Sequence, residues 1–309
     1  HAKESCFPPD ISYRRSMEVS RMRMDYVRLV SSYLVFGSNG ILASHIMLSS
    51  LEIVYLRTFI GSLFLIVAFL LTGGRFTAFR KMRDLGFLLL SGIAMGASWM
   101  FLYEAYRQIG VGLATLAYYV GPAIVMVAAP LVFKERLVPA RLKGFAVVLL
   151  GMVLVNGDAF AQGAVSWGLA CGLMSAVMLA VMVIFNRMAA SITGFENAVL
   201  QLTVSFLTVA VFVVARQGLT VSVPSGSLMP MLLLGLVNTG YGCYLYFSTM
   251  QRLPAQTVVI TGYMEPLSAL IFSALLLGER MAPIQIAGAA MILGGALYGE
   301  RAGMKEAKA

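Results

Sequence analysis

Long apolar segments, separated by short polar stretches, follow one another along almost the whole chain. A helix needs about 20 mostly apolar residues to cross the hydrocarbon core of a bilayer, and ten segments approach or exceed that length. Their connections are short, which leaves no room for a separate soluble domain. The pattern therefore predicts an all-α polytopic membrane protein. The predicted spans cover residues 28–48, 51–73, 84–106, 110–132, 141–157, 165–189, 195–215, 229–250, 254–277 and 282–299.

The second half of the sequence repeats the first at a displacement of 143 or 144 residues. Each copy holds five predicted spans, an odd number, so the second copy must enter the membrane with the opposite orientation. Two similar halves in opposite orientations can exchange conformations and open the protein to either side. We therefore expect ten transmembrane helices as two inverted five-helix repeats around a central cavity. The matched residues, first copy then second, are Glu52 and Glu196, Gly92 and Gly235, Leu102 and Leu245, Tyr103 and Tyr246, Gln108 and Gln251, Pro122 and Pro266, Glu135 and Glu279, Gly144 and Gly288, and Gly151 and Gly295.

The predicted spans divide the chain into a first repeat at 28–157 and a second repeat at 165–300, with tails at 1–27 and 301–309. The leading tail begins with His1, contains Pro8-Pro9 and scattered charges, and lacks the continuous apolar core of a signal peptide. We interpret it as vector-derived sequence or a disordered tail without function. Met17, Met22 and Met24 are the candidate native starts.

The distribution of positive charge predicts the orientation. Hydrophobic residues make up 59% of the chain and charged residues 12%, which excludes a water-soluble protein of ordinary proportions. If the first span starts in the cytoplasm, the inner side holds nineteen of the 23 Lys and Arg residues, the outer side holds Arg107, Arg216 and Arg280, and Arg57 lies within a span. We expect an inner or plasma membrane protein with both termini in the cytoplasm. The net charge of +9 then reflects topology, not nucleic-acid binding.

Two segments carry a resemblance to a known family. Residues 119–137, which begin Tyr-Val-Gly-Pro and end Lys-Glu-Arg-Leu, and residues 263–280, which begin Tyr-Met-Glu-Pro and end Leu-Gly-Glu-Arg, resemble the two copies of the signature in EamA-type members of the drug/metabolite transporter superfamily. The resemblance extends from about residue 28 to 300. It implies a ten-helix bundle with a central cavity and alternating access. Members of that family move amino acids, other metabolites, cofactors and toxic compounds. One departure is that Gln201 occupies the position of Arg57 in the second copy.

Glu265 is the most prominent polar residue within a predicted span. It lies about eleven residues from either end, which at ~1.5 Å per residue places it ~17 Å deep. Pro266 follows it and removes a backbone donor, which frees a carbonyl one turn earlier. A carboxylate at that depth is usually functional, so we expect Glu265 to contact a substrate or a coupling proton. A neutral Glu265, hydrogen-bonded to a neighbouring helix, is the alternative.

Further polar and aromatic residues predict the lining of the cavity. Asn39 and Asn238 either orient a substrate or tie helices together. Arg57 either binds a substrate carboxylate, pairs with Glu52 or caps backbone carbonyls. Trp99 and Tyr103 share one stripe of the third span, and the hydroxyl and indole donors of deep aromatic residues need partners. The candidate substrate-binding residues are Glu265, Asn39, Asn238, Trp99, Tyr119, Tyr241, Arg57, Tyr103 and Tyr118.

The motifs of several enzyme classes are absent from the sequence. There is no GxxxxGK[ST], HExxH or GxSxG, and Cys6, Cys171 and Cys243 fit no metal-ligand spacing, so we expect no catalytic residue, metal or cofactor. The partners expected are a small-molecule substrate, the lipid bilayer and a coupling proton, with the chain as monomer or homodimer. The paired glycines of the last span in each copy predict close helix contact, either within the chain or in a dimer.

The sequence as a whole favours a secondary transporter. We expect export of an amino acid or a related amphipathic compound by alternating access, where the direction rests on the family resemblance. One alternative is uptake of a cationic amine such as choline, because aromatic faces and a carboxylate attract an ammonium group. A membrane-embedded enzyme is the alternative outside transport.

Overall fold

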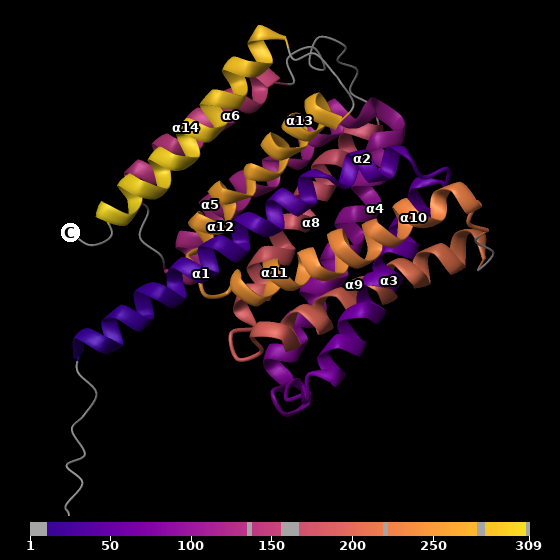
Figure 1. The fold of residues 1–309 in the computed structure, drawn as a ribbon, viewed down its shortest axis with the longest axis horizontal. Coiled ribbons are helices and arrows are strands. Elements are labelled where there is room, and N and C mark those ends of the chain that lie inside the picture. Colours follow the sequence, from indigo (N-terminus) through magenta and orange to yellow (C-terminus); the bar gives the residue numbers. More distant parts are fainter. Residues whose placement is uncertain (1–10, 135–137, 156–166, 219–221, 277–281, 307–309) are drawn as a thin grey trace, which may run out of the picture.

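The computed structural model describes residues 11–134, 138–155, 167–218, 222–276 and 282–306, and within these ranges it contains helices and no strand (Figure 1). The helices form one bundle, with the pair α6 and α14 along one flank. The elements are α1 (Ile11–Gly37), α2 (Asn39–Ser44), α3 (Ser50–Leu71), the 3-10 turn η1 (Ala78–Arg80), α4 (Met82–Tyr118), α5 (Val120–Phe133), α6 (Pro139–Val155), α8 (Trp167–Met188), α9 (Gly194–Gln217), α10 (Ser225–Leu233), the π-helical turn η2 (Leu234–Tyr241), α11 (Gly242–Thr249), α12 (Ala255–Gly262), α13 (Met264–Leu276) and α14 (Pro283–Glu306).

Each of the ten predicted spans coincides with a helix or with a run of consecutive helices, which confirms the predicted all-α polytopic fold. Spans one, four, eight and nine are each built from more than one element. In the described part of the chain, five helical stretches are long and apolar enough to cross a membrane, and two shorter apolar helices accompany them, at Val120–Phe133 and Ile286–Gly299. The five stretches are Ser50–Leu71, Met82–Ile109, Trp167–Met188, Gly194–Arg216 and Ser225–Thr249.

Helix α4 contains both the third span and the start of the fourth. Its 37 residues would extend over ~55 Å if straight, far more than the bilayer core. However, the Cβ atoms of Ala105 and Ala117 both lie within 4 Å of the position that a Cβ on Gly172 would take. Two residues twelve positions apart in a straight helix are separated by ~18 Å. The chain therefore reverses between Ala105 and Ala117, where the sequence predicts the boundary between two spans.

Two pairs of equivalent elements pack against each other, α3 on α9 and α6 on α14, and the equivalent fourth and ninth spans meet through α5 and α12. Contacts between non-equivalent elements also come in matched sets, since α1 packs on α13 as α8 packs on α5. This is the pattern that a two-fold relation between the repeats requires. The equivalent helices run antiparallel, because Tyr55 and Phe206 meet near one end of α3 and Phe69 and Phe195 meet near the other. The repeats are thus inverted, as the odd number of spans predicts.

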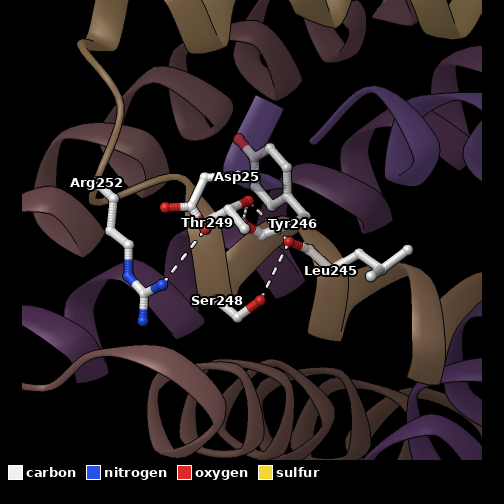
Figure 2. A network of polar contacts seen from close by, with 6 residues as sticks. All are labelled: Asp25, Leu245, Tyr246, Ser248, Thr249 and Arg252. Carbon is white, nitrogen blue, oxygen red and sulfur yellow. Dashed lines mark hydrogen bonds and ion pairs between the residues drawn. The ribbon is translucent and has the colours of Figure 1, made fainter. Parts of the chain in front are cut away.

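The first helix begins well before the first predicted span. α1 starts at Ile11, so of the two interpretations of the leading tail the disordered one is wrong from Ile11 onward, and residues 1–10 lie outside the described part of the chain. No proline follows Pro9 in this stretch, and each residue added to an existing helix gains a backbone hydrogen bond. A tertiary contact also holds the segment: the buried carboxylate of Asp25 accepts a hydrogen bond from Arg252 at 3.3 Å (Figure 2).

Candidate functional site

A polar cluster surrounds Arg57 in the interior of the bundle. Helix α3 begins with a capping box between Ser49 and Glu52, and Arg57 follows after about one and a half turns. Its side chain is only 4% exposed. Its Nε donates to the hydroxyl of Thr239 at 3.0 Å and its Nη1 donates to the hydroxyl of Tyr103 at 3.2 Å. The guanidinium also lies 4.8 Å from the centroid of the Trp99 ring.

Arg57 has unused N–H donors and makes no direct ion pair within the part of the chain that the structure describes. A guanidinium carries five N–H donors, and the two hydrogen bonds above leave Nη2 without a protein partner among the described residues. Glu52, the predicted alternative partner, accepts hydrogen bonds from the backbone and side chain of Ser49 instead. A buried cation without an anion is costly. Because the guanidinium fork matches the two oxygens of a carboxylate, the cluster is suited to bind one.

Glycine permits the close helix approach that builds the cluster. Gly61 lies one turn after Arg57 on the same face of α3, and a Cβ there would lie 2.9 Å from Cγ2 of Thr239 and 3.1 Å from the backbone nitrogen of Gly240. The backbones of α3 and η2 are thus nearly in contact. This proximity brings the Thr239 hydroxyl within reach of Arg57.

The two candidate asparagines form a single contact. The side-chain nitrogen of Asn238 lies 2.9 Å from the carbonyl oxygen of Val35, 2.8 Å from the hydroxyl of Ser38 and 3.1 Å from the amide oxygen of Asn39. These acceptors surround the break between α1 and α2. Asn238 therefore ties the eighth span to the broken first span. It is also the chain neighbour of Thr239, so one segment of η2 contacts both the break and Arg57.

Glu265 lies in the first turn of α13, and its side chain is half-buried. No hydrogen bond to its carboxylate is found among the described residues, whereas its backbone oxygen accepts from Ser268 at 2.9 Å. The helix breaks at Tyr263. The carbonyl of the preceding residue, Gly262, would accept from the backbone N–H of residue 266, but Pro266 has no N–H. This is the interruption that Pro266 predicts. The charges of Glu265 and Arg57 act on each other, and both act on Tyr118.

The first repeat has the same interruption, and the two breaks meet. α4 ends at Tyr118 and α5 begins at Val120, so the break lies at Tyr119, the counterpart of Tyr263. The rings of Tyr119 and Tyr263 are 5.3 Å apart, and the Tyr263 hydroxyl donates to the backbone oxygen of Tyr119 at 3.1 Å. Tyr118 packs edge-on against Tyr119 at 5.5 Å. The contact joins the fourth and ninth spans near the centre of the bundle.

The structure thus separates the sequence-predicted residues into groups. Arg57, Trp99 and Tyr103 lie together, Asn39 and Asn238 lie together, and Tyr118 and Tyr119 lie together, with Glu265 within electrostatic range of the last pair. Tyr241 lies apart from all of them. It is 48% exposed and packs against Tyr244, which in turn packs against Phe195.

Several residues of the site were not predicted from the sequence. Thr239 is an uncharged residue in an apolar run, so no local pattern distinguishes it. Tyr33 donates to the backbone oxygen of Val258 at 2.9 Å and packs at 5.6 Å against Tyr246, and the charge of Glu265 acts on both rings. Tyr246 is the repeat counterpart of Tyr103. The internal repeat therefore contained a signal for that residue.

The position equivalent to Arg57 is neutral and satisfied within the protein. Gln201 is fully buried, accepts a hydrogen bond from Asn186 at 3.0 Å and lies 3.6 Å from the sulfur of Met95. Asn186 and Asn197 also exchange hydrogen bonds, both at 3.1 Å. The amides of this second cluster bond mainly to one another. The two equivalent positions therefore differ in charge, with a cation in the first repeat and a neutral amide in the second.

Known proteins share both the sequence pattern and the fold. The model of the EamA-like transporter family matches twice, at residues 26–157 and 166–298, close to the predicted repeats. The chain is 22% identical over 272 residues to the "Uncharacterized transporter YxxF" of Bacillus subtilis (strain 168), an alignment that covers 87% of each chain. It also resembles a solved structure titled "Crystal structure of protein", with a TM-score of 0.77, 18% identity, and coverage of 90% of this chain and 97% of that one. The latter likeness concerns the fold.

Proposed function

Because the chain belongs to the EamA-like transporter family, we propose that it is a secondary carrier that exports an amino acid or a related amphipathic compound by alternating access. Transport of a small molecule follows from the family. The substrate class and the direction are the proposal, and the direction rests on the resemblance described above. No catalytic step is assigned to the chain.

The single observation that carries the substrate class is the unpaired edge of Arg57. Tyr103, Thr239 and Trp99 hold the guanidinium from three sides, and Nη2 has no partner among the residues described. A carboxylate bound there neutralises the buried charge and uses the remaining N–H donors. Hydrogen bonds to charged groups each contribute about 1.5–3 kcal/mol, enough to select a carboxylate-bearing ligand.

Glu265 supplies the complementary charge. Its carboxylate has no hydrogen-bond partner in the described part of the chain, and its charge acts on the aromatic side chains of Tyr33, Tyr118 and Tyr119. An ammonium group is attracted both by a carboxylate and by aromatic faces. A zwitterion with its carboxylate at Arg57 and its amine towards Glu265 satisfies both ends. When the amine has left, Glu265 can take up a proton in its place. This exchange would couple substrate transport to the movement of protons.

The carboxylate of Glu265, with no hydrogen-bond partner among the described residues, favours a second candidate, uptake of a cationic amine such as choline. An amine needs only Glu265 and the surrounding tyrosines, and Arg57 would then repel it. The two candidates therefore make opposite demands on Arg57.

The direct test is binding by the purified protein. We expect one or more of the common L-amino acids to bind, and Arg57→Gln to weaken that binding by about tenfold to a hundredfold. Arg216→Gln, which changes an exposed arginine on α9, is the matched control and should bind normally. If choline binds instead, Trp99→Ala and Tyr119→Ala should weaken it most, and Arg57→Gln should leave it equal or tighter. Amino-acid binding that is insensitive to Arg57→Gln contradicts the proposed site.

We further propose that the protein lies in the inner or plasma membrane with both termini in the cytoplasm. The support is the excess of Lys and Arg on one side of the spans. In this orientation the end of the bundle that holds Lys81, Arg187 and Arg252 faces the cytoplasm.

A further inference from the structure

The eighth span contains a π-helical turn, η2, that contacts the candidate site through Thr239 and Asn238. A π-helical turn is rare, carries i→i+5 hydrogen bonds and occurs frequently at functional positions. Here it covers Leu234–Tyr241 in the eighth span. Its counterpart in the third span, around Gly92 and Gly96 on α4, is regular α-helix. The irregularity therefore belongs to the second repeat, on the side that faces Arg57.

Thr239 shows how the turn holds Arg57. Its hydroxyl accepts from Nε of Arg57 at 3.0 Å and donates to the carbonyl oxygen of Leu234, five residues earlier, at 2.8 Å. Threonines in the α-helices of this chain donate to the carbonyl four residues earlier, as Thr58 does to Val54 and Thr203 to Val199. If η2 became α-helical, the hydroxyl would turn to the carbonyl of Gly235. Its oxygen would then move away from Arg57.

Asn238 connects the same turn to the break in the first span. It is 2% exposed, and its side-chain nitrogen contacts Val35, Ser38 and Asn39 at the junction of α1 and α2. Asn238 and Thr239 are adjacent in the chain, so a change in the winding of η2 moves both. The repeat counterparts at the same displacement are Met95 and Gly96, which have no side-chain hydrogen-bonding group of this kind.

We propose that η2 is a relay that couples occupancy of Arg57 to the junction of α1 and α2, with Thr239 and Asn238 as its two positioning residues. The inference rests on the proposed function, in which a carboxylate occupies Arg57. A ligand shifts a conformational equilibrium only by the difference in its affinity for the two states. A carboxylate on Arg57 supplies that difference, because the pose of Arg57 described above requires the π-helical form. Departure of the ligand then releases the junction.

The test measures the junction without any ligand. A cysteine introduced at Gly40 on α2, where a Cβ meets no atom within 4 Å, is labelled with a membrane-impermeant maleimide in the full-length protein. Cys6 is replaced by Ser, and Cys171 and Cys243 are buried. Asn238→Ala removes the tie and should change the labelling rate about fivefold, the effect of one hydrogen bond. Thr239→Val and Arg57→Gln should change it in the same direction by about threefold or more, although neither residue contacts α2 in the structure.

Two further variants complete the design. Val237→Ala alters a 42% exposed side chain of the same turn and should label within about twofold of wild type. Thr239→Ser keeps the hydroxyl, so its labelling rate should also equal that of wild type. If its labelling rate instead equals that of Thr239→Val, the proposed role of the hydroxyl is wrong. If Thr239→Val and Arg57→Gln match the control while Asn238→Ala does not, the contact is a local tie and the relay is wrong.

The outcomes also separate the relay from the proposed function. Loss of amino-acid binding in Arg57→Gln with unchanged labelling leaves the function standing and overturns the relay. Changed labelling in Arg57→Gln with unaltered amino-acid binding leaves the relay standing and overturns the proposed role of Arg57 in substrate binding.

Discussion

Gly144 of α6 and Gly295 of α14 lie backbone to backbone. A Cβ on Gly144 would lie 2.5 Å from the carbonyl oxygen of Gly295, and a Cβ on Gly295 would lie 2.7 Å from the carbonyl oxygen of Gly144. Gly151 meets Gly288 in the same way, at 2.6 Å. The helices run antiparallel, because the earlier glycine of α6 meets the later glycine of α14. The close helix contact that the glycine spacing predicts is therefore made within one chain.

The first prediction concerns this interface. Gly144→Ala places a methyl group against backbone that cannot rotate away, so we expect it to destabilise the protein by about 1–3 kcal/mol, the cost of overpacking. Gly294→Ala is the matched control, since a Cβ there meets nothing within 4 Å. Thermal unfolding in detergent should show a lower midpoint for Gly144→Ala alone. Equal midpoints for Gly144→Ala and Gly294→Ala would show that α6 and α14 can move apart to accept the methyl group without loss of stability.

The second prediction concerns the contact between Asp25 and Arg252 (Figure 2), whose two partners differ in exposure. The side chain of Asp25 is 9% exposed and that of Arg252 is 49% exposed. Arg252→Gln leaves a buried carboxylate without its cation and should cost about 1–3 kcal/mol. Asp25→Asn leaves an arginine that water can reach and should cost less than about 1 kcal/mol. The measurement is thermal unfolding of both variants.

The control for this contact is the exposed pair Glu104 and Arg107, at 2.8 Å with Arg107 68% exposed. Glu104→Gln and Arg107→Gln should each change stability little. A larger loss in Asp25→Asn than in Arg252→Gln would contradict the assignment of Asp25 as the buried partner.

The third prediction concerns Glu265. If it binds an amine or a coupling proton, Glu265→Gln should abolish transport or uncouple it from the proton gradient, while the protein still inserts and elutes as a single species. The change keeps the shape of the side chain and removes its charge. Flux into proteoliposomes at several pH values is the measurement. Wild-type flux with an unchanged pH profile would reduce Glu265 to a structural role.

The fourth prediction concerns orientation. A cysteine in place of Arg75, in the segment between α3 and α4, should react with an impermeant maleimide only from the cytoplasmic side. A cysteine in place of Gly226, in the first turn of α10, should react only from the opposite side. Both positions are exposed. The reverse pattern would show that the excess of positive charge faces outward.

The sequence predicted the position of each span because each span is an apolar run of sufficient length. It also placed the break of the ninth span, since Pro266 removes a donor at a fixed distance from the freed carbonyl. The fourth span has the same break before Pro122, the repeat match of Pro266. Trp99 and Tyr103 were predicted to share a face because they are four residues apart, and both contact Arg57.

Other features depend on long-range packing, which single-chain patterns do not contain. The π-helical form of η2 has no periodicity of its own, and Thr239 acquires its role only because Gly61 lets α3 approach. The break after Gly37 has no proline to mark it. The helix from Ile11 extends a span into a polar stretch, where apolar periodicity gives no signal.

The hydrogen bond between Tyr263 and Tyr119 has a direction, although the two residues are repeat counterparts. Tyr263 donates its hydroxyl to the backbone of Tyr119, so the pair breaks the symmetry that relates the repeats. When two inverted repeats exchange conformations, each adopts the local geometry of the other. In the opposite state Tyr119 should donate and Tyr263 should accept. Under the proposed alternating access, the polarity of this one bond would identify which side of the membrane the protein faces, and Tyr119→Phe and Tyr263→Phe should favour opposite states.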